Sequence, residues 1–346
     1  MLQIAGRPIG PEYPPFVIAE VAQSHEGSLG NAFAFAEVAR DCGAHAIKFQ
    51  THIAAEESTP SEPWRIPFSR QDESRYEYWR RMEFTFDQWA ALKDHCDALG
   101  IIFLSSPFSL RACEWLERLD MAAWKVASGE IRNSQLLGFL RGTGKPILLS
   151  TGLADPEEAT ALARDLSAQG NQVGLFHCTT QYPTPPEQVG LNVLEAYREA
   201  LGAIPVGLSD HSGSPVAGMV AAYLGANMIE VHLTLHPKAF GPDVVASLTP
   251  EALRQLVEGS DAAWRMARNP VDKADQLERL ADLRTTFGRS LFTTRALPAG
   301  TCLSEDMLAY KKPAGGLAFE NRNLLLGRTL TRDLPADHML STQDVG

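Results

Sequence analysis

The segment MIEVHLTLH, residues 228–236, alternates apolar and polar side chains in the manner of a β-strand. Glu230, His232 and Thr234 occupy every second position of this run. Because strand side chains alternate between the two faces of a sheet, these three polar groups point the same way. A carboxylate beside an imidazole can serve proton transfer, metal binding or simple hydrogen bonding. The polar side chains on this face therefore contact either solvent or a reaction centre.

Seven further β-like runs precede this segment and alternate with stretches that have helical spacing. We expect strands at residues 16–21, 46–50, 101–107, 122–128, 146–151, 173–179, 206–211 and 228–235. Strands that alternate with helices form parallel sheets with right-handed crossovers. Eight such units favour a (β/α)8 TIM barrel over a doubly wound sheet, and no glycine-rich dinucleotide fingerprint follows the first run.

Nearly every run ends in polar or ionisable residues. They include Glu20, Lys48, Gln50, Ser105, Ser106, Lys125, Ser128, Ser150, Thr151, His177, Thr179, Ser209, Asp210, His211, Glu230 and His232. Barrel enzymes build their active sites at the C-terminal ends of the strands. Strands on a protein surface would not all need polar residues at this end. We therefore expect the polar strand ends to converge on one site.

These residue types leave several kinds of chemistry open. Lysines suit the phosphate or carboxylate of a small anion, although a lysine within a strand can also be half of a buried ion pair. His211 and His232, at the ends of adjacent strands, could share a divalent metal ion or could be hydrogen-bonded core residues. The role of His52 stays open between ligand, acid-base group and structural hydrogen bonder.

Composition narrows the classes of partner. The chain has 346 residues, 45% of them hydrophobic, and a net charge of -11, which argues against nucleic acid and anionic membranes. Five scattered cysteines without a CxxC pair are typical of a reducing, cytoplasmic compartment. The first residues show no signal-peptide pattern, and the apolar tract at 216–229 is too short to span a bilayer.

The last part of the chain differs from the barrel-like part. We expect a catalytic barrel over residues 1–267, a charged linker over 268–288 and a small β-rich domain over 289–346. Within that domain Arg295-Ala-Leu-Pro-Ala is echoed by Arg332-Asp-Leu-Pro-Ala, and each is followed by a Leu-Ser pair. A repeat this short fits a pseudo-twofold β-rich domain.

Several of these motifs together resemble the sialic acid synthases, the N-acetylneuraminate synthase family. The motifs are IAEVAQSHEGSLGNA, AIKFQTH, WKVASGEIRNSQLL, GKPILLSTG, LFHCTTQYPTPPE, VGLSDHSG and EVHLTL…GPDVVASLTPEAL, in this order through almost the whole chain. The last domain resembles the antifreeze-like (SAF) domain that members of this family carry. The combination of KVASGE, HCTxxYPTP and GLSDH is highly specific, whereas each motif alone would be weak.

The resemblance implies an activity. Family members condense phosphoenolpyruvate with N-acetylmannosamine and water, giving N-acetylneuraminate and phosphate. It also implies a divalent metal that polarises the sugar aldehyde, Mn²⁺ first with Mg²⁺ or Co²⁺ as alternatives. A domain-swapped homodimer is implied as well, in which the SAF domain covers the partner's barrel mouth.

The resemblance also assigns roles to individual residues. Glu20, His211 and His232 are expected to be catalytic, and the two histidines to bind the metal. Lys48, Lys125, Ser106, Ser128 and Ser150 would hold phosphoenolpyruvate. The acceptor sugar would contact Gln50, Ser69, Thr180, Tyr182, Ser209, Asp243 and Lys312, with Glu130 as a further polar candidate.

Some positions depart from the family pattern. Thr180 stands where an Asn is expected, Ser69 lies in the loop after the second strand, and Lys312 replaces an Arg before Pro. Arg and Lys are not interchangeable where bidentate hydrogen bonding is needed. Val231 replaces a basic residue, but alternation directs it toward the helical layer. The departures leave legionaminic or pseudaminic acid synthase, using a diacetamido sugar, as an alternative to neuraminate synthase.

Two other classes of function stay open. One is a metal-dependent aldolase or lyase on the same barrel. The other is a non-catalytic sugar-binding protein, suggested by the SAF-like domain. The joint presence of Glu20, Lys48, Lys125, His211 and His232 argues against binding alone.

Overall fold

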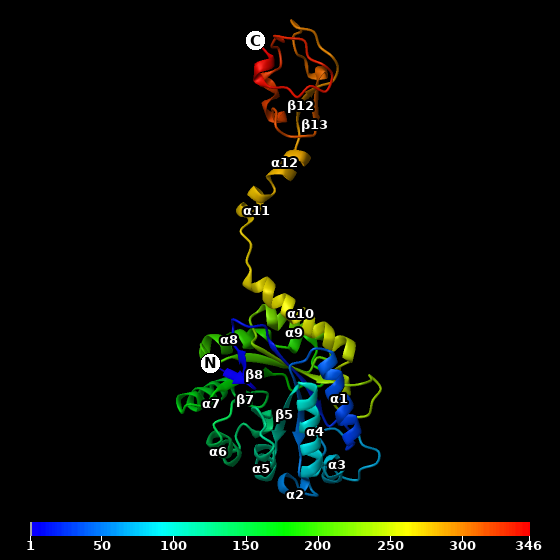
Figure 1. Ribbon diagram of the computed structural model, residues 1–346, viewed down its shortest axis with the longest axis vertical. Coiled ribbons are helices and arrows are strands. Elements are labelled where there is room, and N and C mark those ends of the chain that lie inside the picture. Colours follow the sequence, from blue (N-terminus) through cyan, green and yellow to red (C-terminus); the bar gives the residue numbers. More distant parts are fainter. Residues whose placement is uncertain (1) are drawn as a thin grey trace. The chain divides into compact units, whose positions relative to one another are not determined.

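The computed structural model describes residues 2–346, which divide into two compact units (Figure 1). The first unit ends at Asn269, and the second covers Pro270–Gly346. Within the described residues, no helix is both long and apolar enough to cross a membrane.

Eight parallel strands close into a barrel in the first unit, as the alternation of strand and helix patterns predicts. They are β3 (Phe16–Ala22), β4 (Ala46–Thr51), β5 (Ile102–Pro107), β6 (Trp124–Val126), β7 (Ile147–Ser150), β8 (Val173–Cys178), β9 (Val206–Asp210) and β10 (Met228–Leu233). Each strand pairs with the next, and β10 pairs with both β9 and β3. The short strand β11 (Ser247–Leu248) extends beside the end of β10. The prediction of a (β/α)8 barrel is therefore confirmed.

Helices surround the strands and bury their apolar faces against the outside of the barrel (Figure 1). They are α1 (Leu29–Asp41), α4 (Phe86–Leu99), α5 (Leu110–Arg118), α6 (Ser134–Gly142), α7 (Pro156–Ala168), α8 (Leu191–Leu201), α9 (Pro215–Tyr223) and α10 (Pro250–Arg268). The short helices α2 (Ala54–Glu57) and α3 (Arg75–Met82) lie in the long connection between β4 and α4. Short 3-10 turns are η1 (Ser128–Glu130), η2 (Pro186–Gln188) and η3 (Val244–Ala246). Local sequence marks several starts: Thr85 and Gln88 form a capping box that satisfies free N–H groups at the start of α4.

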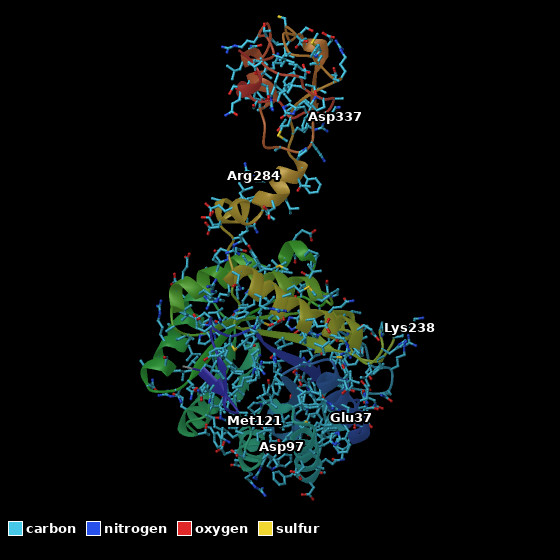
Figure 2. All side chains as sticks on the ribbon, turned by 45° about the horizontal axis from the view of Figure 1, so that its top comes forward. Glu37, Asp97, Met121, Lys238, Arg284 and Asp337 are labelled. Atoms are coloured by element: carbon cyan, nitrogen blue, oxygen red, sulfur yellow. The ribbon has the colours of Figure 1, made fainter. Side chains whose placement is uncertain are left out.

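Charged residues lie on the outward side of this helical layer. Glu37 of α1 and Asp97 of α4 are exposed, whereas Met121, between α5 and β6, is fully buried (Figure 2). Val231 packs in the core between strands and helices, as alternation predicts for this position. Its side chain therefore points away from the barrel interior.

The barrel interior has an apolar layer and a polar layer. Ile18, Ala46, Leu104, Leu148 and Met228 belong to one apolar cluster. The antiparallel hairpin β1 (Leu2–Ile4) and β2 (Arg7–Ile9) adds Leu2, Ile4 and Ile9 to this cluster. Because strand side chains repeat every two residues, the next inward position on each of these strands lies one step closer to the C-terminal end. Those positions are Glu20, Lys48, Ser106, Ser150 and Glu230.

The second unit begins with helices α11 (Lys273–Arg279) and α12 (Ala281–Phe287) and continues as a small β-rich domain. Strands β12 (Ser290–Thr293) and β13 (Leu308–Lys311) pair in antiparallel fashion, and the 3-10 turns η4 (Glu305–Met307), η5 (Phe319–Leu324) and η6 (Thr342–Asp344) complete it. The two copies of the sequence echo meet: Leu297 and Leu334 form an antiparallel bridge and are both buried. The short repeat thus builds the core of this domain.

Candidate active site

Two adjoining cavities lie where the barrel strands end. The strand-end cavity, of about 260 Å³, is lined by Glu20, Lys48, Gln50, Arg65, Ser106, Lys125, Ala127, Ser128, Ser150, Leu153, Cys178, Thr180, Tyr182, Ser209, His211, Glu230 and His232. The loop cavity, of about 430 Å³, shares Gln50, Arg65, Ala127, Tyr182 and His232 with it and continues between the loops. Most of the residues expected at the site therefore line one continuous region.

Two lysines and two carboxylates form a buried network in the strand-end cavity. Lys48 Nζ lies 2.6 Å from Glu20 Oε2 and 3.6 Å from Glu230 Oε1. Lys125 Nζ lies 3.1 Å from the same Glu230 oxygen and donates to Ser150 Oγ at 2.5 Å. The interpretation of the lysines as halves of buried ion pairs is therefore correct, and the same lysines also line the cavity.

Burial and charge act against each other on these groups. Burial would lower the pKa of Lys48, but the neighbouring carboxylates of Glu20 and Glu230 outweigh it and raise that pKa. Burial lowers the pKa of Lys125, which Glu230 only partly offsets. Burial would raise the pKa of Glu230, but Lys125 and Lys48 lower it. Glu230, which contacts both lysines, thus acts against the effect of burial on each of them.

The two predicted metal ligands lie side by side. The imidazole centroids of His211, at the end of β9, and His232, on β10, are 5.2 Å apart. Burial keeps the pKa of His211 well below its ordinary value, so its ring is neutral and able to act as a ligand. The buried Nδ1 of His232 has no hydrogen-bond partner. Tyr182 Oη lies 2.8 Å from His211 Nε2.

The two histidines suit a metal ion as a pair rather than as part of a larger cage. Among residues 2–346, no cluster of three or more His, Cys, Asp or Glu side chains is arranged to hold a metal. Catalytic metal sites keep positions open for water or substrate. Two imidazoles are donors that a divalent transition-metal ion accepts, so the chemistry of this pair fits such an ion.

The loop cavity has an aromatic wall and charged groups that are already paired. Its aromatic residues are Trp64, Phe68, Tyr78, Trp79, Phe108 and Tyr182. Arg65 lies 4.6 Å above the Tyr182 ring and donates to Asp243 Oδ1 at 3.1 Å. Glu130 accepts a hydrogen bond from Asn133 at 2.8 Å. Aromatic walls with a few placed polar groups are typical of a site for a small molecule.

Four of the expected residues have particular surroundings. Ser128 Oγ accepts a hydrogen bond from Gly152 N at 3.1 Å, and Thr180 packs against the same glycine, where an added Cβ would lie 2.6 Å from its methyl carbon. Ser69 Oγ instead donates to Asp72 Oδ2 at 2.7 Å in the loop before α3, and Ser69 does not belong to the lining of either cavity. Lys312 belongs to the second unit, where its Nζ lies 4.9 Å from the Phe287 ring centroid.

Other residues at the site had no role assigned from sequence. Glu230 links both lysines and also accepts from Ser209 Oγ at 3.2 Å. Cys178 lines the strand-end cavity, and the two-residue alternation along β8, with Phe176 in the inner apolar cluster, could have found it. Arg65 lies in an irregular loop and carries no periodic signal.

Comparisons with known proteins agree with this fold and site. Residues 35–271 match the NeuB family, and residues 288–346 match the SAF domain. The chain is 31% identical to N,N'-diacetyllegionaminic acid synthase of Campylobacter jejuni over 94% of its own length and 98% of that protein. It is 30% identical to human N-acetylneuraminate-9-phosphate synthase over 88% of its length and 85% of that protein.

A solved structure extends the comparison to both units. The crystal structure of spore coat polysaccharide biosynthesis protein SpsE from Bacillus subtilis matches with a TM-score of 0.67 and 29% identity, covering 100% of this chain and 99% of that one. The fold and the matches define a parallel (β/α)8 barrel followed by a SAF domain. The chain belongs to the NeuB family.

Proposed function

We propose that the protein is an N-acetylneuraminate synthase that condenses phosphoenolpyruvate with N-acetylmannosamine and water. The observation that carries this proposal is the convergence of Lys48, Lys125, Glu20 and the pair His211 and His232 on one cavity. Two lysines suit the phosphate and carboxylate of phosphoenolpyruvate, and Ser106, Ser128 and Ser150 supply hydroxyl groups around them.

The reaction joins C3 of phosphoenolpyruvate to the aldehyde carbon of the open-chain sugar, whose oxygen takes up a proton. Water adds to C2, and the C2–O bond to phosphate then breaks, which releases inorganic phosphate. Glu20, held at Lys48, is placed to accept the proton of that water. Lys48 and Lys125 hold the leaving phosphate and the carboxylate, so they stabilise the charge that develops on the phosphate oxygen.

We propose that His211 and His232 hold a divalent ion, Mn²⁺ first, with Mg²⁺ or Co²⁺ as alternatives. The neutral ring of His211 and the unpartnered Nδ1 of His232 support this assignment. When bound, such an ion would polarise the sugar aldehyde as a Lewis acid. Tyr182 and Gln50 orient the acceptor beside it, since both line the two cavities.

The charges of the loop cavity favour an acceptor without a phosphate. Its lining contains the carboxylates of Glu57, Glu62, Glu130 and Asp243 and the two arginines Arg65 and Arg75. Arg65 lies 3.1 Å from Asp243, and Arg75 lies 3.3 Å from Glu62, so both cations already have carboxylate partners. A phosphorylated hexosamine would bring more negative charge to this lining. We expect its kcat/KM to be at least about tenfold lower than that of the free sugar.

One alternative remains for the identity of the acceptor sugar. A diacetamido sugar would make the protein a legionaminic or pseudaminic acid synthase, which the legionaminic acid synthase relative supports. N-Acetylmannosamine stays first because THIAAEES and the HCT-YPTP context resemble the neuraminate branch. Comparison of kcat/KM for N-acetylmannosamine and the two diacetamido acceptors decides between them. A preference of about a hundredfold or more for a diacetamido sugar would replace the neuraminate assignment.

Phosphate release tests the reaction class. The pure protein with phosphoenolpyruvate and Mn²⁺ should release phosphate only when an N-acetylated hexosamine is present. Release without an acceptor, or no release with any acceptor, would contradict the proposal. An aldolase or lyase would act on pyruvate instead, and a sugar-binding protein would show acceptor affinity without turnover.

We further propose a homodimer in which the SAF domain, residues 289–346, joined by the linker 268–288, covers the partner's barrel, residues 1–267. Mixing a Lys48→Ala variant with a variant that lacks the SAF domain tests this arrangement. Mixed dimers should regain activity, because one barrel of each pair is then intact and covered. Activity in the SAF-less variant alone equal to wild type would exclude the covering role.

A further inference from the structure

His52, the residue that follows β4, lies beside the proposed site and has no role in the reaction as described so far. Its ring is buried and stacks between Trp79 and Phe108, at centroid distances of 4.1 Å and 4.2 Å. Both stacking partners come from outside the strand, one from α3 and one from the loop after β5. The imidazole is therefore held in one plane by its neighbours.

Both ring nitrogens of His52 face oxygen acceptors. Nδ1 lies 2.5 Å from Glu57 Oε1, and Nε2 lies 3.1 Å from Gln50 Oε1. The orientation of the Gln50 amide follows from its other end, where Nε2 donates to Glu20 Oε1 at 3.0 Å. Because the amide oxygen of Gln50 can only accept, the Nε2 of His52 is the donor in that contact.

A continuous chain of contacts thus leads from Glu57 to the reacting groups. It runs through His52, the two ends of the Gln50 amide, Glu20 and Lys48. An unrestrained glutamine side chain has several rotamers and can turn its amide over, which would set oxygen against oxygen at Glu20. An N–H of His52 directed at Gln50 Oε1 excludes that orientation.

We propose that His52 and Glu57 are positioning residues that hold the Gln50 amide and, through it, the carboxylate of Glu20. This inference rests on the proposed role of Glu20 in the condensation. His52 belongs to the lining of the loop cavity, but in this role it acts through Gln50 rather than on the reacting atoms. Its effect on turnover passes entirely through Gln50.

The first experiment is a double-mutant cycle. His52→Phe keeps a ring between Trp79 and Phe108 but removes both hydrogen bonds. We expect its kcat to fall about 10- to 100-fold, with the KM for phosphoenolpyruvate within about threefold of wild type. In a Gln50→Ala background the same change should have little further effect on kcat, because the connection from His52 to Glu20 through the Gln50 amide is already lost. An equal loss in both backgrounds would overturn the positioning role.

A conservative change separates hydrogen bonding from charge. In Glu57→Gln the new amide N–H can donate to His52 Nδ1, which leaves Nε2–H directed at Gln50. This variant should retain most of the kcat that His52→Phe loses. A loss as large as that of His52→Phe would mean that the charge of Glu57 matters rather than the orientation of the ring, and would contradict the inference.

The same strand offers a matched control at its other end. His45 directly precedes β4, stacks on Phe16 at 5.5 Å and accepts a hydrogen bond from Val17 N at 2.8 Å. His45→Phe should leave kcat unchanged, even if it lowers the melting temperature. A fall in kcat equal to that of His52→Phe would show that loss of either stacked histidine next to β4 disturbs the site, which would overturn the inference.

Crystal structures test the positioning role of His52 independently of any activity measurement. In His52→Phe the Gln50 amide should lose its contact with Glu20 or adopt more than one orientation. Retention of the 3.0 Å contact in a single orientation would overturn the inference. A wild-type protein that fails to release phosphate with every acceptor would instead contradict the proposed function, and the structural comparison would still decide the positioning role.

Discussion

Lys48 Nζ lies 2.6 Å from Glu20 Oε2, and the two residues are direct partners in the register of β3 and β4. Both side chains are almost fully buried. Lys48 is thus already engaged by a carboxylate. Under the proposed function, binding of phosphoenolpyruvate to Lys48 would weaken this ion pair and free Glu20 for the water.

Glu20→Gln should separate binding from turnover. Loss of the carboxylate charge releases Lys48 for the substrate, so the Kd of phosphoenolpyruvate should fall several-fold. Loss of the base should lower kcat about 10²- to 10⁴-fold. Calorimetric titration and steady-state rates measure the two effects. Weaker phosphoenolpyruvate binding with an unchanged kcat would show that Glu20 serves only to orient Lys48.

His211→Ala and His232→Ala should each abolish turnover and weaken Mn²⁺ binding while the fold stays intact. The reason is that both imidazole rings line the strand-end cavity instead of packing in the hydrophobic core. Metal titration and circular dichroism of each variant check this. Wild-type activity of either variant in chelator-treated buffer would exclude a shared metal.

Lys312→Arg should change the KM of the acceptor and leave that of phosphoenolpyruvate nearly unchanged. Guanidinium and ammonium groups differ in the geometry with which they hydrogen-bond a carbonyl. Lys311→Arg is the matched control, because that neighbouring side chain already pairs with Asp337. Equal effects of Lys312→Arg on both substrates would refute a role at the acceptor.

Asp344→Asn should destabilise the second unit by about 2–3 kcal/mol. The buried carboxylate accepts hydrogen bonds from Arg332 at 2.7 Å and from Ser341 N at 2.9 Å. Hydrogen exchange of this unit in the full chain measures the loss. Asp337→Asn is the control, since Asp337 is 69% exposed and its ion pair should contribute at most about 1 kcal/mol. Similar losses in both variants would contradict a special role for Asp344.

The same carboxylate predicts how the stability of this unit depends on pH. Burial would raise the pKa of Asp344, but the bonds from Arg332 and Ser341 outweigh it and lower that pKa. Its contribution should therefore be complete above the ordinary aspartate value of 3.8 and decline as pH falls below it. Denaturant unfolding at pH 6 and pH 3 should show a smaller difference between wild type and Asp344→Asn at the lower pH. A difference that grows toward acid would mean that the shift has the opposite sign.

The barrel and most of the strand-end cavity could be predicted from the chain alone, because both follow from short periods. Apolar runs that alternate with helical spacing predict eight parallel units, and the two-residue period of a strand puts Glu20 two positions above Ile18 and Glu230 two above Met228. Several strands are shorter than expected, and β6 differs most: it covers only Trp124–Val126, since η1 follows at Ser128.

Tertiary structure alone decided how these groups meet. The register between strands sets Glu20 against Lys48, and closure of the barrel by β10 brings Glu230 within reach of both lysines. The contacts of Arg65 with Asp243 and of His52 with Glu57 join residues outside the barrel strands, where the two-residue period of a strand does not apply. Side-chain direction in a strand is a local consequence of backbone geometry, whereas contact between distant segments depends on packing of the whole chain.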